Sequence, residues 1–378
     1  MTPIPLRALH PAVAGTQPRR APSPRTTSRD LAKHIIQFDP EDRSTYAPFS
    51  LPAAVLASGA ARSPIPWPTG QAPVPAPLAT APQPDAPLPQ FDYLVVTWTV
   101  AEAKCLADTL TPGHPSATAW YHYAHNFTTE FLPQIRRGAP ARSAMRLGSW
   151  FPTQIGAKRV MCFKSELHLS QDGPKLPIAA LWQQLIAEVK PKLVITTGTA
   201  GGIGAGVELG DVVVAKTVRF DCMKEFKSRP FHTSSYDCSP LNTASFAVAR
   251  QLFSANAGHL PAAPRPPAIF ATPSADVPLP DIVTTDFFAF DDTSNTFALQ
   301  DLGGAVEMGD AVLGLVTHGL GPGAPIWTAV RNASDPEIDS AGLTEKEAAT
   351  KAAQIYERYG YWTTIPSAIT CWALIVDN

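Results

Sequence analysis

Hydrophobic and polar positions are patterned most clearly between residues 193 and 215. Two apolar runs rich in β-branched residues, 193–197 and 212–215, flank a loop of glycine and other small residues. Neither run has a helical period, which is typical of strands buried on both faces of a sheet. Glycines let the backbone between them adopt unusual angles and approach a ligand closely. The pattern therefore predicts a strand, a ligand-binding loop and a second strand.

Other apolar runs and amphipathic segments predict the remaining elements. Further strands are expected at 93–97, at 160–163 and in the run that begins at Ile326. Helices are expected at 101–110, 177–190 and 242–253. Thr344 and Glu347 form a capping box that opens another helix, which Gly360 is expected to end. A last apolar helix is expected at 367–376.

Proline divides the chain into two parts. The first ninety residues hold 19 of the 40 prolines, and residues 63–90 are mostly Pro, Ala and other small residues. Such a stretch lacks backbone donors and apolar bulk, which favours an extended linker. We therefore expect residues 1–90 to form a Pro-rich, largely irregular N-terminal extension and residues 91–378 to form the folded domain. Residues 30–38 have the pattern of a short helix that either docks on this domain or a partner protein, or forms only transiently.

Composition excludes several classes of function. The chain has 378 residues, 45% hydrophobic and 16% charged, with a net charge of −2, so it can bury a full core and gives no electrostatic argument for binding nucleic acid or an anionic membrane. No run approaches the roughly 18–20 apolar residues of a membrane helix, and no apolar stretch follows the early arginines as in a secretion signal. The five cysteines form no Cys-x-x-Cys pair, so neither a zinc site nor a disulfide framework is expected. These features fit a cytoplasmic protein.

Three segments, in this order along the chain, resemble those of a known family. They are Thr-Gly-Thr-Ala-Gly-Gly at 197–202 with Leu-Gly-Asp at 209–211, Val-Glu-Met at 306–308, and the strand that ends in Ser-Asp at 334–335. Together they resemble the superfamily of nucleoside phosphorylases and nucleosidases, especially the methylthioadenosine/S-adenosylhomocysteine nucleosidase type, over roughly residues 92–359. The resemblance implies a three-layer α/β/α sandwich with a central twisted mixed sheet, a dimer or higher homo-oligomer, and no metal or other cofactor.

The resemblance also implies two catalytic carboxyl groups. Asp335 matches an aspartate that faces the purine ring, where general-acid catalysis makes the base a better leaving group. Glu102, at the start of the helix after the first strand, matches a glutamate that activates the attacking water. Each residue has a structural alternative: Asp335 as the cap of the next helix, and Glu102 as a surface residue favoured by the positive end of its own helix.

A set of substrate-binding residues follows from the same resemblance. Phe288 matches an aromatic residue that stacks on the base, and Met308 matches a methionine that packs under the ribose. The glycine loop is expected to contact the ligand. The residues expected to bind substrate are Thr199, Ala200, Gly201, Phe288, Glu307, Met308, Asp310, Arg331 and Ser334.

The chain departs from the family pattern at three places. Thr285 stands where the family has glycine, and residues 166–168 replace a glycine-rich segment after the third strand. Gly309 replaces the glutamate that accepts the ribose hydroxyl hydrogens. Either Asp310 or Glu307 then holds the ribose, or the sugar is recognised in a different way.

The sequence favours hydrolysis over phosphorolysis. Related phosphorylases place an arginine two residues before the first glycine of the central loop, and here that residue is Thr196. Glu102 would also repel a phosphate dianion in a pocket of low dielectric constant. A carboxylate that activates water on one side and an acid that assists departure on the other are typical of glycoside hydrolysis. We therefore expect hydrolysis of a purine nucleoside or nucleotide, with a phosphorylase as the first alternative.

Two alternatives from other classes of function remain open. Gly309 favours a nucleoside-binding module that has lost catalysis. The resemblance to the superfamily also leaves open a nucleotide-depleting effector of a bacterial defence system, with residues 1–90 as the arm that docks a partner protein.

Overall fold

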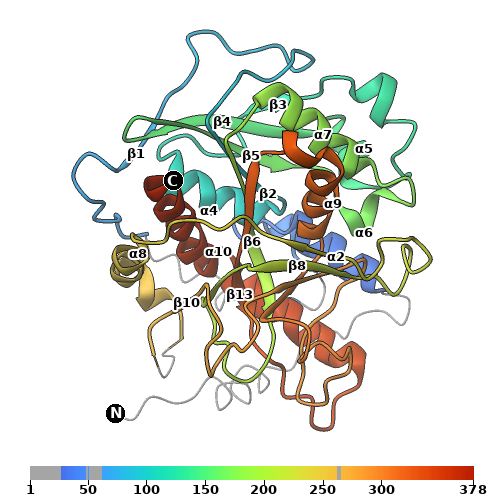
Figure 1. Cartoon of the computed structure of the whole chain (residues 1–378). Coiled ribbons are helices and arrows are strands. Elements are labelled where there is room, and N and C mark those ends of the chain that lie inside the picture. Colours follow the sequence, from blue (N-terminus) through green and yellow to red (C-terminus); the bar gives the residue numbers. More distant parts are fainter. Residues whose placement is uncertain (1–26, 48–49, 51–61, 262–264) are drawn as a thin grey trace.

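A mixed β-sheet crosses the centre of the protein in the computed structural model, which describes residues 27–47, 50, 62–261 and 265–378 (Figure 1). Thirteen strands within these residues form the sheet, and its main path runs in the order β1-β4-β5-β2-β6-β12-β11-β8-β9. Strand β13 pairs with β6 and β7, β10 pairs with β7, and β3 pairs with β4. The strands are β1 (Pro73–Pro75), β2 (Tyr93–Thr97), β3 (Tyr121–Tyr123), β4 (Gly148–Ile155), β5 (Lys158–Ser165), β6 (Leu193–Gly202), β7 (Val212–Val214), β8 (Thr217–Asp221), β9 (Ser235–Asp237), β10 (Ile269–Phe270), β11 (Ile282–Thr285), β12 (Ala305–Glu307) and β13 (Ile326–Asp335).

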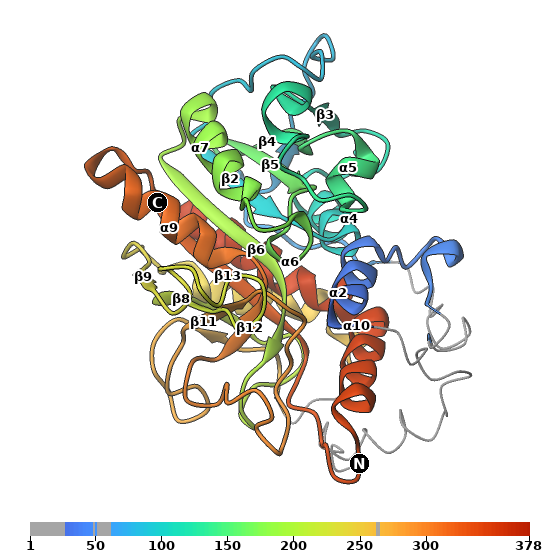
Figure 2. The same ribbon diagram turned by 90° about the vertical axis from the view of Figure 1, so that its right-hand side faces the viewer.

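Helices cover both faces of this sheet (Figure 2). Successive residues of β2 show the two faces: Leu94 and Val96 belong to a cluster that includes α7 and α9, whereas Tyr93 and Val95 belong to one that includes α4, α8 and α10. The result is the three-layer α/β/α sandwich that the sequence predicts. The helices are α2 (Ser28–Gln37), α4 (Val100–Leu110), α5 (Pro140–Ala144), α6 (Leu169–Asp172), α7 (Pro177–Val189), α8 (Phe246–Phe253), α9 (Asp310–Leu320) and α10 (Glu345–Asp377).

The central strand β6 continues through the first part of the expected glycine loop. Its parallel pairing with β13 extends from Leu193 opposite Ile326 to Gly201 opposite Asp335, and all ten residues of β6 are buried. The ladder supplies backbone partners as far as Gly202, which explains why the loop begins only after this residue. The pairing also places the first and third family-like segments side by side at the carboxyl ends of two neighbouring strands.

Helix α10 is one continuous helix, so the prediction that Gly360 ends it and that a separate helix follows is wrong. Thr344 and Glu347 form the expected capping box at its start. Pro366 lies inside the helix, and most residues around it are buried against the sheet and α4. A Cβ atom on Gly360 would lie 2.9 Å from the ring of Tyr356, so this glycine makes room for a neighbouring side chain. Tertiary packing overrides the local stop signals here.

Residues before the expected domain boundary at 91 also pack on the domain. Helix α2 begins after the capping residue Thr27 and buries Leu31, Ala32, Ile35 and Ile36. Leu31, Ala32 and Ile35 join a cluster with α10, in which the hydroxyl group of Tyr356 donates to the backbone oxygen of Ile35 (3.3 Å). The short helix predicted at 30–38 is therefore docked on the domain. The division into residues 1–90 and 91–378 stays a prediction, and residues 1–26 lie outside the described part of the chain.

None of the described helices combines the length and the hydropathy needed to cross a lipid bilayer.

Candidate active site

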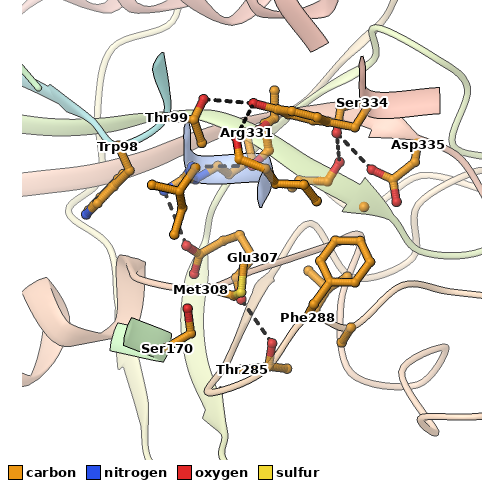
Figure 3. A pocket seen from close by; sticks show the side chains of 18 of the residues that line it. Trp98, Thr99, Ser170, Thr285, Phe288, Glu307, Met308, Arg331, Ser334 and Asp335 are labelled. Atoms are coloured by element: carbon orange, nitrogen blue, oxygen red, sulfur yellow. Dashed lines mark hydrogen bonds and ion pairs between the residues drawn. The ribbon is translucent and has the colours of Figure 1, made fainter. Parts of the chain in front are cut away.

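A cavity lies where β2, β6, β12 and β13 end (Figure 3). Apolar and polar side chains line it in similar numbers, and the polar ones carry carboxyl, hydroxyl, imidazole and guanidinium groups. It is lined by Ile35, Ile36, Trp98, Thr99, Glu102, His168, Ser170, Thr199, Ala200, Gly201, Thr285, Phe288, Ala289, Val306, Glu307, Met308, Arg331, Ser334, Asp335 and Tyr356.

The cavity brings together ten of the eleven site residues expected from the sequence. The exception is Asp310, which does not line it. The lining residues that sequence reasoning missed come mainly from α2, from the turn after β2 and from the segment after β5. Three of the other lining residues carry a signal in the sequence: His168 and Thr285 lie at departures from the family pattern, and Val306 belongs to the Val-Glu-Met segment.

Asp335 is a buried carboxyl group at the end of β13. The Ser334 hydroxyl group lies 2.8 Å from Asp335 Oδ1 and 3.2 Å from the backbone oxygen of Ala200, so its hydrogen is shared between two acceptors. Burial raises the pKa of Asp335 to about 7, although the hydrogen bond from Ser334 acts in the opposite direction. A carboxyl group with such a pKa can hold and release a proton at neutral pH. It does not cap the next helix, because Thr344 does.

Glu102 lies at the third position of α4, and its carboxylate is surrounded by donors. Oε2 accepts hydrogen bonds from the Thr97 hydroxyl group (2.7 Å) and from the backbone N–H groups of Trp98 (3.0 Å) and Thr99 (2.9 Å). Oε1 accepts hydrogen bonds from the backbone N–H (2.7 Å) and the hydroxyl group (2.6 Å) of Thr199. The carboxylate thus ties β2 and α4 to the end of β6, and Glu102 is not a surface residue.

Close approach of β6 makes this arrangement possible. Gly198 has φ of +142°, and a Cβ atom there would lie 2.4 Å from the carboxyl carbon of Glu102. Any other residue at this position would therefore strain the backbone and displace the carboxylate.

We expect Glu102→Gln to lower the free energy of unfolding by about 2–4 kcal/mol. Both carboxylate oxygens accept backbone N–H groups, so a glutamine amide nitrogen must face a buried donor in either orientation, and unpaired buried groups cost roughly 1–3 kcal/mol each. Urea denaturation measures the change. The exposed Glu130 provides the control, because Glu130→Gln should leave the transition unchanged. An unaltered transition in Glu102→Gln would show that the donors around the carboxylate rearrange freely.

A buried ion cluster lies beside these two carboxyl groups. Arg331 donates from Nε to Asp310 Oδ2 (2.8 Å) and from Nη2 to Asp310 Oδ1 (2.5 Å), and Nη2 also lies 3.3 Å from Glu307 Oε2. The guanidinium group stacks 4.8 Å from the ring centre of Trp98. Because the Asp310 carboxylate is fully buried and holds Arg331, the expectation that Asp310 contacts the ribose has no support in this geometry.

Glu307 is the carboxyl group of this cluster that faces the cavity. It accepts hydrogen bonds from the Thr284 hydroxyl group and from the backbone N–H of Asp310 (2.9 Å). Burial and the neighbouring Asp310 raise the pKa of Glu307, whereas Arg331 lowers it. Gly309, the residue after Met308, has no side chain, and a Cβ atom there would lie 3.3 Å from the indole of Trp98. Trp98 thus occupies the space beside Gly309.

Helix α2 forms one wall of the cavity. Ile35 and Ile36 line it, and the Ser28 hydroxyl group hydrogen-bonds to both backbone groups of Phe288, accepting from its N–H (2.8 Å) and donating to its oxygen (3.4 Å). The Thr285 hydroxyl group donates to the backbone oxygen of Phe287 (2.7 Å), which holds the preceding turn. The N-terminal helix therefore positions Phe288 as well as closing the cavity.

Comparison with known families gives a clear match. Residues 154–359, more than half of the chain, match the family model of the phosphorylase superfamily. The chain belongs to the phosphorylase superfamily. The match includes β6, β12 and β13, and therefore Asp335 and Arg331, whereas Glu102 and α2 lie before it.

Solved structures of low sequence identity align with this phosphorylase-superfamily chain. A 5′-methylthioadenosine/S-adenosylhomocysteine nucleosidase from Neisseria meningitidis, in complex with methylthio-immucillin-A, is 18% identical with a TM-score of 0.45, covering 75% of this chain and 98% of its own. Futalosine hydrolase from Helicobacter pylori is 14% identical with a TM-score of 0.45, covering 76% and 97%. No curated protein matches the chain in sequence.

A resident metal ion has no evident site in the described part of this superfamily member. No group of three or more His, Cys, Asp or Glu side chains is arranged there to hold an ion. The acid groups at the site are instead engaged by serine, threonine, arginine and backbone donors.

Proposed function

We propose that this protein hydrolyses the N-glycosidic bond of a purine nucleoside and releases the free base and the sugar. The observation that carries the proposal is Asp335, a buried carboxyl group with a pKa raised to about 7, which lines the cavity close to Phe288 (Figure 3). Phe288 stacks on the purine, and Asp335 donates a proton to a ring nitrogen as the glycosidic bond breaks. A neutral base departs more readily than an anion, so this proton transfer lowers the barrier.

The remaining carboxyl groups stabilise the sugar and the water. The bond breaks through an oxocarbenium-like state, whose positive charge is favoured by nearby carboxylates. Met308 packs against the ribose and Glu307 accepts its hydroxyl hydrogens. Glu102, on the opposite side from the base, orients the attacking water. Its fixed position between β2 and β6 makes the carboxylate a preorganised acceptor.

Charge in the cavity favours water over phosphate as the nucleophile. Among the described residues that line it, Arg331 is the single permanently cationic side chain, and Asp310 and Glu307 already engage it. Glu102, Glu307 and Asp335 also line the cavity. A phosphate dianion would have to enter beside these carboxyl groups without a free cation to neutralise it.

We expect purine release to be independent of phosphate and to yield the free sugar. The test incubates the full-length protein with adenosine, inosine and guanosine in phosphate-free buffer and in phosphate, and separates bases and sugars by chromatography. Ribose 1-phosphate as the main product would overturn hydrolysis in favour of phosphorolysis.

A nucleoside-binding module without catalysis is the second candidate. It is favoured by Gly309, which has no side chain at the position where the resemblance places a ribose-binding carboxylate. Binding of nucleosides without release of base under any condition would support it.

A further inference from the structure

The end of the cavity away from Asp335 carries polar side chains that have no part in binding or protonating the base. Figure 3 shows Trp98 and Ser170 on the side of the cavity opposite to Asp335 and Phe288. Ser170 and His168 belong to the segment after β5, and both line the cavity. This segment includes the residues that replace the glycine-rich family pattern.

His168 is buried without a hydrogen-bond partner for one ring nitrogen. Only 3% of the residue is exposed, and Nε2 makes no hydrogen bond within the described residues. Burial lowers the pKa of His168 to about 3, and the nearby Lys164 acts in the same direction. The ring is therefore neutral and offers one donor and one acceptor. A buried ring nitrogen without a partner is costly unless a ligand supplies one.

Two further uncharged groups line the same end. Trp98 Nε1 is a buried donor that also has no partner among the described residues. The Ser170 hydroxyl group accepts a hydrogen bond from Gln171 Nε2 (3.2 Å), which leaves its hydrogen for an acceptor. Nearby positive charge is already engaged, because Lys164 pairs with Glu166 at 2.5 Å and does not line this cavity.

We propose that His168 and Ser170, with Trp98, bind an uncharged hydroxyl group at the 5′ end of the nucleoside and exclude a 5′-phosphate. In a nucleoside the base on C1′ and the 5′ carbon on C4′ are attached on either side of the ring oxygen, so a base held between Phe288 and Asp335 directs the 5′ end toward the other end of the cavity. A hydroxyl group donates and accepts, which matches a neutral imidazole and a serine. A phosphate would need a free cation, whereas Arg331 beside Trp98 and the nearby Lys164 are already paired with carboxylates within the described residues. This inference rests on the proposed function for the orientation of the substrate.

The test compares adenosine and inosine with their 5′-deoxy analogues and their 5′-monophosphates. Dissociation constants are measured by calorimetry and kcat/KM by base release, for the full-length wild type and for His168→Phe and Ser170→Ala. We expect the wild type to prefer the 5′-hydroxyl compounds by about 10- to 100-fold, because the analogue leaves buried polar groups unpaired. The preference should fall to less than about threefold in His168→Phe and shrink in Ser170→Ala. His318→Phe, at an exposed position of α9, should retain the preference.

The outcomes separate this inference from the proposed function. Base release with equal kcat/KM for hydroxyl and deoxy substrates, or efficient release from the monophosphates, overturns the inference and leaves hydrolysis standing. If the wild type binds the 5′-hydroxyl compounds preferentially, His168→Phe loses this preference and no base is released, the inference stands and hydrolysis is overturned. A uniform loss on all substrates in His168→Phe means that the residue is structural, and Ser170→Ala, a smaller change, then decides. Absence of both binding and base release overturns both.

Discussion

Asp335→Asn is expected to lower kcat by about 10²- to 10⁴-fold on the best nucleoside substrate, which is the typical contribution of a positioned acid. Asparagine keeps the shape of the side chain, and its oxygen can still accept the hydrogen bond from Ser334 (2.8 Å in the wild type). Its amide can hydrogen-bond to the base but cannot transfer a proton. We therefore expect KM to change much less than kcat, as steady-state base release will measure.

The pH dependence of this variant identifies the proton donor. Burial raises the pKa of Asp335 to about 7, and an acid works only in its protonated form, so kcat/KM of the wild type should decline above about pH 7. Asp335→Asn should lack this alkaline limb. A variant with near wild-type turnover, or one that keeps the same limb, would show that Asp335 is not the acid.

Stability provides the control for the same substitution. The pKa of Asp335 is higher in the folded protein (about 7) than its ordinary value of 3.8. Between these values the folded state holds a proton that the unfolded state releases, so this residue makes unfolding easier as pH rises from about 4 to 7. Asparagine does not titrate. Asp335→Asn should therefore gain thermal stability relative to the wild type as pH rises, whereas a residue needed as a helix cap would make the variant less stable.

Part of the site can be predicted because short sequence patterns mark the strand ends that form it. The ends of β6 and β13 are recognisable because β-branched runs and the Gly-rich and Ser-Asp segments occur together, and parallel pairing then places them side by side. The cavity forms at this junction, with Glu102 and Phe288 around it. Glu102 can be predicted because it lies in the first turn of α4, directly after β2.

Other features depend on contacts between distant parts of the chain. Ser28 bonds to Phe288 across 260 positions, and no pattern within residues 30–38 indicates which surface the helix covers. Asp310 does not line the cavity, because it is the first residue of α9 and its carboxylate accepts hydrogen bonds from the buried Arg331. The unbroken course of α10 through Pro366 follows from burial on neighbouring elements. Such outcomes are set by tertiary packing, which local propensity does not contain.

The largest effect on stability is expected for Arg331→Met. Arg331 is 2% exposed and neutralises Asp310 and Glu307, which are both buried. Removing it leaves two carboxyl groups without a cation in a dry environment, and breaking a buried pair in this way typically costs 3–5 kcal/mol. Urea denaturation should show a loss of about this size, with most base release lost as well. Arg331→Lys keeps the charge but not the two parallel bonds to Asp310, so an intermediate loss is expected.

A double variant separates the net contribution of the cluster from the penalty of breaking it. Asp310→Asn alone leaves Arg331 with Glu307 as its remaining buried carboxylate partner and should lower stability, with little effect on KM because Asp310 does not line the cavity. Asp310→Asn combined with Arg331→Met removes one of the two stranded carboxylates, so its loss should be smaller than the sum of the two single losses by at least about 1 kcal/mol. Additive losses would mean that Arg331 and Asp310 do not interact across their short contact. A double variant as stable as the wild type would mean that the pair contributes no net stability and serves to hold Arg331 at the cavity.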